Sequence, residues 1–253
     1  MKIIFLGTGT SQGTPLIGCN CTVCKSADNR DKRLRSSVLI NIDEKKILID
    51  AGPDFRQQML QAGITNLDAI LLTHEHIDHV GGLDDVRALN YINDKAVDIY
   101  AENRVQEALH KIFYYVFETV KYPGVPEFKF NTISENNFRI GEIDVIPIRA
   151  YHYKLPVFGF RIRNFCYVTD TNNIPPQEME KLYNLDVLVI DALQRKPHLS
   201  HFCLHETLEI INKLKPQRAY LTHISHQLDL HSTLEKELPV NVFAAYDGLV
   251  VDC

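Results

Sequence analysis

Apolar residues recur in short runs along the whole chain, and most runs are continuous or alternate with polar residues, as in buried strands. The predicted strands span residues 2–7, 37–42, 46–50, 69–74, 97–101, 143–148, 158–162, 165–170, 187–191, 218–222 and 240–245. A helical period appears instead at 54–62, 83–91, 102–118, 176–184 and 204–215. Paired strands come first, then strands mixed with helices, and the second half repeats that order. This pattern predicts an α/β fold in which two mixed β-sheets pack face to face with helices outside. No linker rich in Gly, Ser and Pro interrupts it, so we expect one domain over 1–253.

Composition and charge narrow the class of partner. Of the 253 residues, 45% are hydrophobic and 23% are charged, which is ordinary for a globular protein. The net charge of −5 does not favour a large nucleic-acid partner. The basic run RDKRLR (30–35) is interpreted as a solvated loop.

The apolar segments are short. The N-terminal MKIIFLGTGT is too short for a signal-peptide core, and no apolar run approaches the ~20 residues that span a bilayer. We therefore expect a cytoplasmic protein without a membrane partner, in which thiols stay reduced.

Three of the six cysteines lie together in GCNCTVC (18–24). A disulfide would use two of them and leave one, whereas reduced clustered thiols favour a metal. Zinc takes four ligands, so the fourth must come from a distant segment. The candidates are Cys166, Cys203, Cys253 and His226.

A second cluster of ligand types follows the predicted strand AILLTH, in LLTHEHIDHVGGL (71–83). Its members are His74, His76, Asp78 and His79. Three imidazoles and a carboxylate suit Zn²⁺, and the carboxylate also admits Mn²⁺. The helical HExxH pattern of zinc proteases is absent, because Asp78 stands where its second histidine would be.

The segment THEHIDHVGG matches the H-x-H-x-D-H signature, and the chain resembles the metallo-β-lactamase fold, which binds two metals between two sheets. Further segments occur in the order seen in its PhnP-like phosphodiesterase branch. They are FLGTGTSQGTP, GCNCTVC, LIDAGPDFR, Tyr151-His152, YVTDT and LTHISHQ.

The resemblance implies a dinuclear site of two divalent ions, Zn or Mn. One ion is assigned His74, His76 and His152. The second is assigned Asp78, His79 and His223, and Asp170 bridges both. Asp50 is expected to orient a metal-bound histidine rather than bind metal. For the thiol cluster the resemblance selects His226, which gives a structural zinc with Cys19, Cys21 and Cys24.

The expected reaction is hydrolysis of a small phosphodiester, cyclic or not, of a nucleotide or sugar, with a metal-bridging hydroxide as nucleophile. Asp78 and His201 are the candidate catalytic residues, with His201 as the general acid. His198 and His205 compete for that role, because the segment departs from the branch by one inserted residue. The alternatives are a PqqB-like carrier or binding protein of cofactor biosynthesis and a nuclease similar to tRNA-processing ribonucleases.

Two further segments carry weaker signals. Gly7, Gly9 and Gly13 miss the dinucleotide-binding spacing and are interpreted as a tight loop near the active site. The aromatic run at 110–126 is interpreted as a helix with core aromatics, and a lid or a homodimer contact is the alternative.

Overall fold

Two seven-stranded β-sheets pack face to face in the computed structural model, which describes residues 1–120 and 122–253. The first sheet has the order β14-β1-β2-β3-β4-β5-β6. Its strands are β1 (Lys2–Gly7), β2 (Ser37–Ile42), β3 (Lys45–Ile49), β4 (Ala69–Leu71), β5 (Val97–Ala101), β6 (Phe128–Thr132) and β14 (Val250–Asp252). The second sheet has the order β13-β12-β11-β10-β9-β8-β7. Its strands are β7 (Phe138–Ile140), β8 (Ile143–His152), β9 (Leu155–Ile162), β10 (Phe165–Val168), β11 (Val187–Asp191), β12 (Arg218–Thr222) and β13 (Val242–Ala244).

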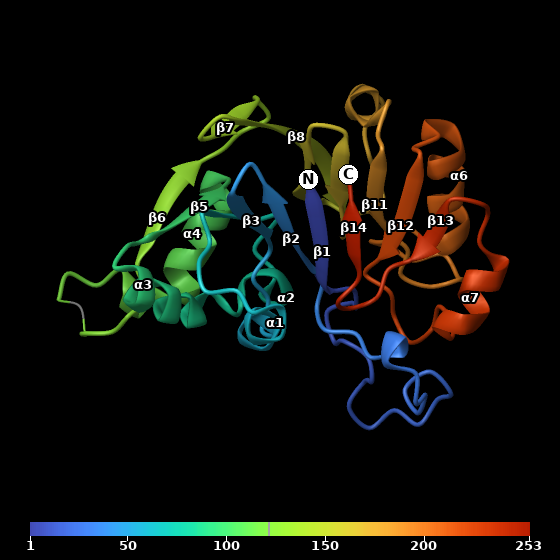
Figure 1. Ribbon diagram of the computed structural model, residues 1–253, viewed down its shortest axis with the longest axis horizontal. Helices are drawn as coiled ribbons and strands as arrows, with labels where there is room; N and C mark the ends of the chain where they lie inside the picture. The colour runs from blue at the N-terminus through green and yellow to red at the C-terminus, as the bar shows by residue number, and fades with distance from the viewer. Residues whose placement is uncertain (121) are drawn as a thin grey trace.

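Helices cover the outer faces of both sheets (Figure 1). The first group is α1 (Phe55–Ala62), α2 (Ile77–Val80), α3 (Arg87–Asn93) and α4 (Asn103–Ile112), and the second is α5 (Pro176–Met179), α6 (Leu204–Leu214) and α7 (His231–Glu237). Short 3₁₀ helices occur at η1 (Asn29–Asp31), η2 (Leu83–Val86), η3 (Tyr114–Val116) and η4 (Glu180–Leu182).

Three apolar layers follow from the alternation of side chains along the strands. Between the sheets, one face of each strand contributes fully buried residues such as Phe5, Ile40, Phe158 and Tyr167. The opposite faces pack under the two groups of helices. Sheet residues are buried on both faces, which explains why many strands read as continuous apolar runs.

Parallel pairing brings several strand ends to the same side of the molecule. Strands β3 to β6 are parallel neighbours in the first sheet, and β10 to β13 are parallel neighbours in the second. Loops after the carboxyl ends of such strands are where ligand sites form in α/β proteins. The predicted ligands His74, His76, Asp78 and His79 follow β4, Asp170 follows β10, and His223 follows β12.

The strand and helix predictions are confirmed for most of the chain, with additions and with three helices that differ. The helix predicted over 83–91 begins as η2 and continues as α3, and the one predicted over 176–184 is divided into α5 and η4. Strands β6, β7 and β14 and helices α2 and α7 are not in the sequence-based assignment. The helix predicted over 102–118 ends at Ile112, because Phe113 leaves the helical backbone (φ −110°, ψ 42°). Within the aromatic run at 110–126, Lys121 lies outside the described residues, so a lid or homodimer role stays a prediction.

The basic run at 30–35 is not simply a solvated loop, and that interpretation was wrong for Arg33. Its guanidinium is buried and donates hydrogen bonds to Thr8 Oγ1 (2.8 Å) and to the carbonyl of Ala245 (2.5 Å). Arg33 therefore ties the loop after β13 to the start of the chain.

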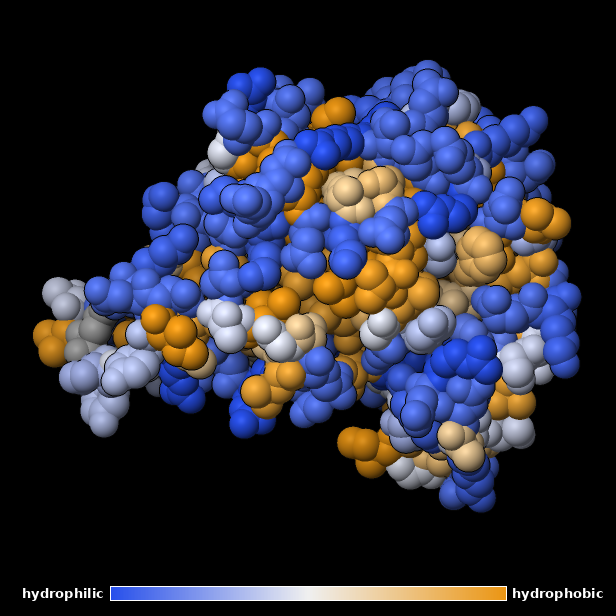
Figure 2. Space-filling view, viewed as in Figure 1, coloured by the Kyte–Doolittle hydropathy of each residue, from blue (hydrophilic) through white to orange (hydrophobic). Residues whose placement is uncertain are grey.

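The surface adds two observations. Figure 2 shows that apolar residues gather across the middle of the face seen in Figure 1, with polar residues over most of its rim. Among the described residues, no helix is both long and apolar enough to cross a membrane.

Candidate functional site

Two predicted metal ligands, together with Asp50, lie on loops that leave the sheets abruptly. Asp50 follows β3, Asp170 follows β10 and His223 follows β12, and all three have positive φ angles of 63°, 52° and 55°. This left-handed conformation is uncommon for residues other than glycine, and such strain concentrates at functional sites. It turns each side chain off its strand toward the same point between the two sheets.

The Asp170 carboxylate is the centre of this cluster. Its Oδ2 lies 2.8 Å from Nε2 of His79 and 3.4 Å from Nε2 of His74, and its Oδ1 lies 2.8 Å from Nε2 of His223. Two groups of potential ligand atoms share this carboxylate. They are His74, His76 and Asp170, and His79, Asp170 and His223.

The structure places the two remaining predicted ligands beside these groups. His152 lies at the end of β8, and its ring centroid is 5.2 Å from that of His76. Asp78 Oδ2 lies 3.2 Å from Nε2 of His79. The predicted set of seven residues is therefore gathered at one point.

Hydrogen bonds fix the proton on Nδ1 of four of these imidazoles. Thr73 Oγ1 donates to Asp50 and Ser36 Oγ donates to the carbonyl of Gly9, so each hydroxyl can only accept from the histidine next to it. The acceptors are Thr73 Oγ1 for His74 (2.9 Å), Asp50 for His79 (2.6 Å), the Ser200 carbonyl for His152 (2.9 Å) and Ser36 Oγ for His223 (3.2 Å). Each Nε2 is then left with a lone pair. This is the arrangement in which histidine binds metal.

The centre of the cluster lacks the protons needed to satisfy its buried atoms. Nε2 of His74, Nε2 of His79 and Oδ1 of Asp170 have no hydrogen-bond partner within the described part of the chain. Buried polar atoms rarely stay unpaired, and a proton or a cation between these nitrogens and the carboxylate relieves the repulsion of their lone pairs. A divalent cation fits this donor set, because it accepts nitrogen and carboxylate lone pairs together.

Burial and charge act in opposite directions on these groups. Burial opposes ionisation of Asp170, but the imidazoles of His223 and His79 outweigh it and hold the pKa of Asp170 well below its usual value. Burial likewise opposes protonation of His79, yet the carboxylates of Asp170, Asp78 and Asp50 raise its pKa. Burial lowers the pKa of His152 to about 4. The cluster thus combines ionised carboxylates with strongly perturbed histidines, a signature of functional sites.

His201 lies against this cluster, whereas His205 does not. The His201 ring centroid is 5.0 Å from that of His223, and its Nδ1 lies 3.7 Å from Asp170 Oδ1. His198 is one step further out, with its ring centroid 5.1 Å from that of His201. The side chain of His205 is 78% exposed on α6, so it is removed from the three candidates for the general acid.

Asp191 was not identified from the sequence. This buried carboxyl ends β11, with Oδ2 at 3.8 Å from Nδ1 of His201, and burial raises its pKa well above the usual value. Neither of its oxygens has a hydrogen-bond partner among the described residues. The signal was available, because Asp191 ends the apolar run VLVID much as Asp170 ends FCYVTD.

The thiol cluster is a separate site. The ligand atoms of Cys19, Cys21, Cys24 and His226 all lie within 4.8 Å of one another. The thiols of Cys19 and Cys21 are each 3.4 Å from Nδ1 of His226. The backbone N–H of Cys24, together with His226, lowers the pKa of the Cys21 thiol to about 6, which favours a thiolate ligand. Of the four candidates for the fourth ligand, the structure brings only His226 to the three thiols.

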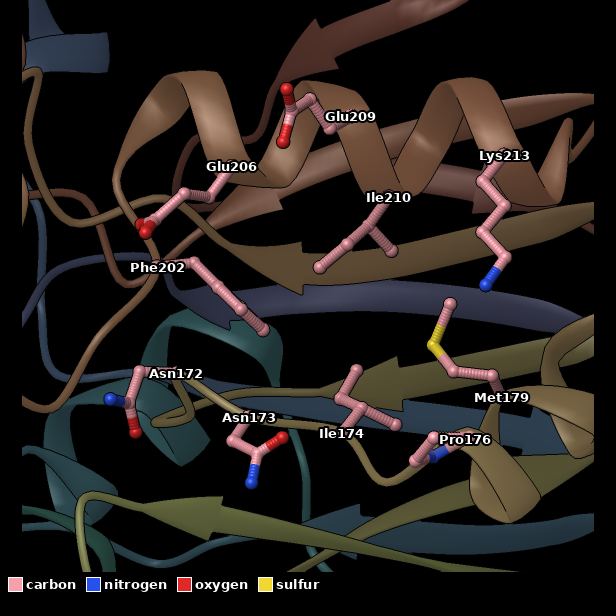
Figure 3. A pocket seen from close by; sticks show the side chains of 10 residues that line it. All are labelled: Asn172, Asn173, Ile174, Pro176, Met179, Phe202, Glu206, Glu209, Ile210 and Lys213. Carbon is pink, nitrogen blue, oxygen red and sulfur yellow. The ribbon is translucent and has the colours of Figure 1, made fainter.

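Another pocket, of about 380 Å³, lies on the outer face of the second sheet (Figure 3). Ile174, Met179 and Ile210 form an apolar lining between α6 and the segment before α5, and Glu206 stands at its rim. Phe202, which also lines this pocket, donates its backbone N–H to the carbonyl of Thr171 (2.8 Å), the residue after Asp170. None of the clustered metal-ligand candidates lines it.

Comparison with known proteins agrees with this architecture. The family model of the β-lactamase superfamily domain matches residues 45–224. Zn²⁺-bound PqqB from Methylobacterium extorquens aligns over all of both chains with a TM-score of 0.80 and 18% identity, which shows a shared fold. The fold and the HxHxDH cluster thus define a metallo-β-lactamase-fold protein.

Two other known proteins have higher sequence identity to this chain. A solved diphosphatase from the PhnP family is 39% identical, with a TM-score of 0.93 over all of this chain and 97% of that one. An octanoyltransferase from Porphyromonas gingivalis is 42% identical over 252 residues, which are 98% of this chain but 51% of that protein. The chain spans about half the length of the curated relatives that it matches, or less. It belongs to the metallo-β-lactamase-fold hydrolases of the PhnP-like branch.

Proposed function

We propose that this chain is a metal-dependent hydrolase of small phosphodiesters, with a cyclic or linear nucleotide or sugar phosphodiester as its substrate. The observation that carries this proposal is the buried Asp170 carboxylate shared by two groups of histidine ligands. Two divalent ions held there, Zn or Mn, would lower the pKa of water and polarise phosphate oxygens. His74, His76 and His152 are assigned to one ion, and Asp78, His79 and His223 to the other, with Asp170 between them.

Side chains around the site are proposed to donate and accept the protons of the reaction. Attack of water on phosphorus releases one proton, and the departing alkoxide takes one up. His201 is our candidate for the donor to the alkoxide. Burial lowers its pKa to about 4, so at neutral pH the imidazole needs a proton source close by.

Asp191 can act as that source. Its Oδ2 lies 3.8 Å from Nδ1 of His201, and burial raises its pKa, which favours the protonated carboxyl. A proton that passes to Nδ1 leaves Nε2 of His201 to protonate the leaving oxygen. The starting state is restored when Nε2 takes up the proton that the attacking water released and Nδ1 returns its proton to Asp191.

The test is turnover of bis(p-nitrophenyl) phosphate by protein loaded with Zn²⁺ or Mn²⁺. The expected result is hydrolysis that disappears with a chelator and returns when metal is restored. A metal-loaded protein that bound two ions near Asp170 but never hydrolysed this diester would contradict the proposal.

A diphosphate is the second candidate substrate. The relative with 39% identity is described as a diphosphatase, and the same ligand set would serve to hydrolyse a phosphoanhydride. A comparison of kcat/KM between cyclic nucleotides or sugar phosphodiesters and nucleoside diphosphate sugars separates the two, with the metal content measured on the same samples.

Three other functions have less support. A PqqB-like carrier would not need the full set of seven site residues that this chain has. A tRNA-processing nuclease would need a basic surface, whereas the net charge is −5. The octanoyltransferase is about twice as long as the segment that matches this chain, so its name does not assign a reaction to this half.

A further inference from the structure

A polar pocket of about 300 Å³ lies beside the catalytic cluster and has no role so far. Three segments far apart in the chain form it, namely the loop after β1, the loop after β11 and the loop after β12. Its polar lining residues are Thr10, Ser11, Gln12, Gln194, His198 and Gln227. Its volume is at the lower end for ligand pockets, which suits one sugar or a group of similar size.

The pocket lies next to His201, the candidate general acid. His198 lines it, and the His198 ring centroid is 5.1 Å from that of His201. Ser225 and His226, which also line it, come directly after His223 and Ile224 in the chain. A substrate whose phosphate lies at the Asp170 cluster can therefore extend its leaving group past His201 into this pocket.

The lining selects a neutral ligand with hydroxyl groups. Hydroxyls and side-chain amides offer both donors and acceptors, and among the residues that the structure describes no Lys, Arg, Asp or Glu lines the pocket. A second phosphate would lose water here without a counter-charge, which is costly. A sugar can instead exchange its bonds to water for bonds to these groups.

The thiol cluster forms part of the same wall. Nδ1 of His226 lies 3.4 Å from the thiols of Cys19 and Cys21, so metal coordination uses this nitrogen. Nε2 then carries the ring proton and becomes a donor whose orientation the cluster fixes. Leu16, whose N–H donates to the thiol of Cys24 (3.4 Å), also lines the pocket.

We propose that this pocket binds the sugar of the leaving group, and that the cluster of Cys19, Cys21, Cys24 and His226 holds its wall in the binding conformation. This inference rests on the proposed function for the position of the phosphate. His226 and the thiols are positioning residues here, because they are not expected to touch the reacting atoms.

The test is direct binding of a neutral probe, methyl β-D-ribofuranoside, measured by ligand-observed NMR. The probe has no phosphate, so the measurement does not depend on turnover. The double variant Gln194→Leu/Gln227→Leu removes two amides from facing loops and should weaken binding about tenfold or more. Cys21→Ser should weaken it as well, because it releases His226. The control Asn173→Leu, in the outer pocket of Figure 3, should bind like the wild type.

The outcomes test the sugar site, the role of the thiol cluster and the proposed function separately. The pocket is wrong as a sugar site if the wild type does not bind the probe, if the double glutamine variant binds it equally well, or if only Asn173→Leu loses binding. Unchanged binding by folded Cys21→Ser overturns the role of the thiol cluster alone. The failure of the proposed function shows separately, as absent diester turnover by a protein that still binds the probe.

Discussion

At the scale of single residues, Asp170 is the group on which the site depends. It is buried among histidines whose Nδ1 atoms are engaged elsewhere, so both of its oxygens face the Nε2 atoms that are left to bind a cation. Asp170→Asn removes the negative charge and one acceptor at the shared position. We expect it to lose bound metal at the catalytic cluster and to abolish diester turnover while the fold survives. Metal analysis, turnover and circular dichroism check this, with the exposed Asp144→Asn as control. Near-normal turnover with two tightly bound ions in Asp170→Asn would contradict the bridging role.

The proton pathway through His201 makes a second prediction. Loss of a general acid typically costs ~10²–10⁴-fold in rate. His201→Ala should show this loss for alkyl leaving groups but a much smaller one for p-nitrophenolate, which leaves without a proton. Asp191→Asn should follow the same order with smaller losses. Equal losses for good and poor leaving groups would argue against the acid role and favour His198.

The same residues predict how pH affects the metal-free protein. Burial lowers the pKa of His152 and of His201 to about 4, below the ~6.5 of an unfolded histidine. At these two residues the folded state therefore binds fewer protons than the unfolded chain between these values, so their contribution to stability is full above pH ~6.5 and is lost toward pH ~4. Thermal melts of chelated protein should show this fall, and His201→Gln should reduce it. Exposed His205→Gln is the control, and an identical fall in wild type and His201→Gln would refute the assignment.

At the scale of elements, strands and helices with strong apolar periodicity were predicted correctly, and those with weak periodicity were missed. Strands such as β2, β5 and β11 were assigned with their observed bounds, because β2 and β11 are nearly continuous apolar runs and β5 alternates buried and half-buried residues. β14 and α7 were missed, since three residues and seven residues carry little periodicity of their own. β14 exists because it pairs with β1, a contact across the whole chain.

The site residues could be predicted only where they belong to a recognisable sequence motif or match the family pattern. His74 to His79 are adjacent in sequence, whereas His152 and His226 are isolated histidines that only the resemblance selected. Nothing in the sequence shows the left-handed backbone of Asp50, Asp170 and His223, or the Nδ1 partners, because both depend on loops packing together. Asp191 ends an apolar run as Asp170 does, but its contact with His201 depends on the same packing of loops.

At the scale of the whole molecule, we expect the thiol cluster to contribute mainly to stability and the Asp170 cluster mainly to catalysis. A thiolate-bound structural zinc contributes ~10–16 kcal/mol of binding free energy in zinc peptides, against ~5–15 kcal/mol of net stability for a domain. Cys21→Ser and His226→Ala should lower the melting temperature and remove about one equivalent of zinc, whereas His74→Ala or His76→Ala should remove activity with less damage to the fold. Zinc content and melting temperature of the four variants decide this, with Cys253→Ser as the control thiol. Full zinc and unchanged stability in Cys21→Ser would mean that the three clustered thiols are not a structural site.

The most direct measurement of the central claim is anomalous diffraction at the zinc absorption edge from crystals of zinc-loaded protein. The account predicts two peaks on either side of the Asp170 carboxylate and a third among Cys19, Cys21, Cys24 and His226. A map with a single peak at Asp170, or with none there, would contradict the shared dinuclear site.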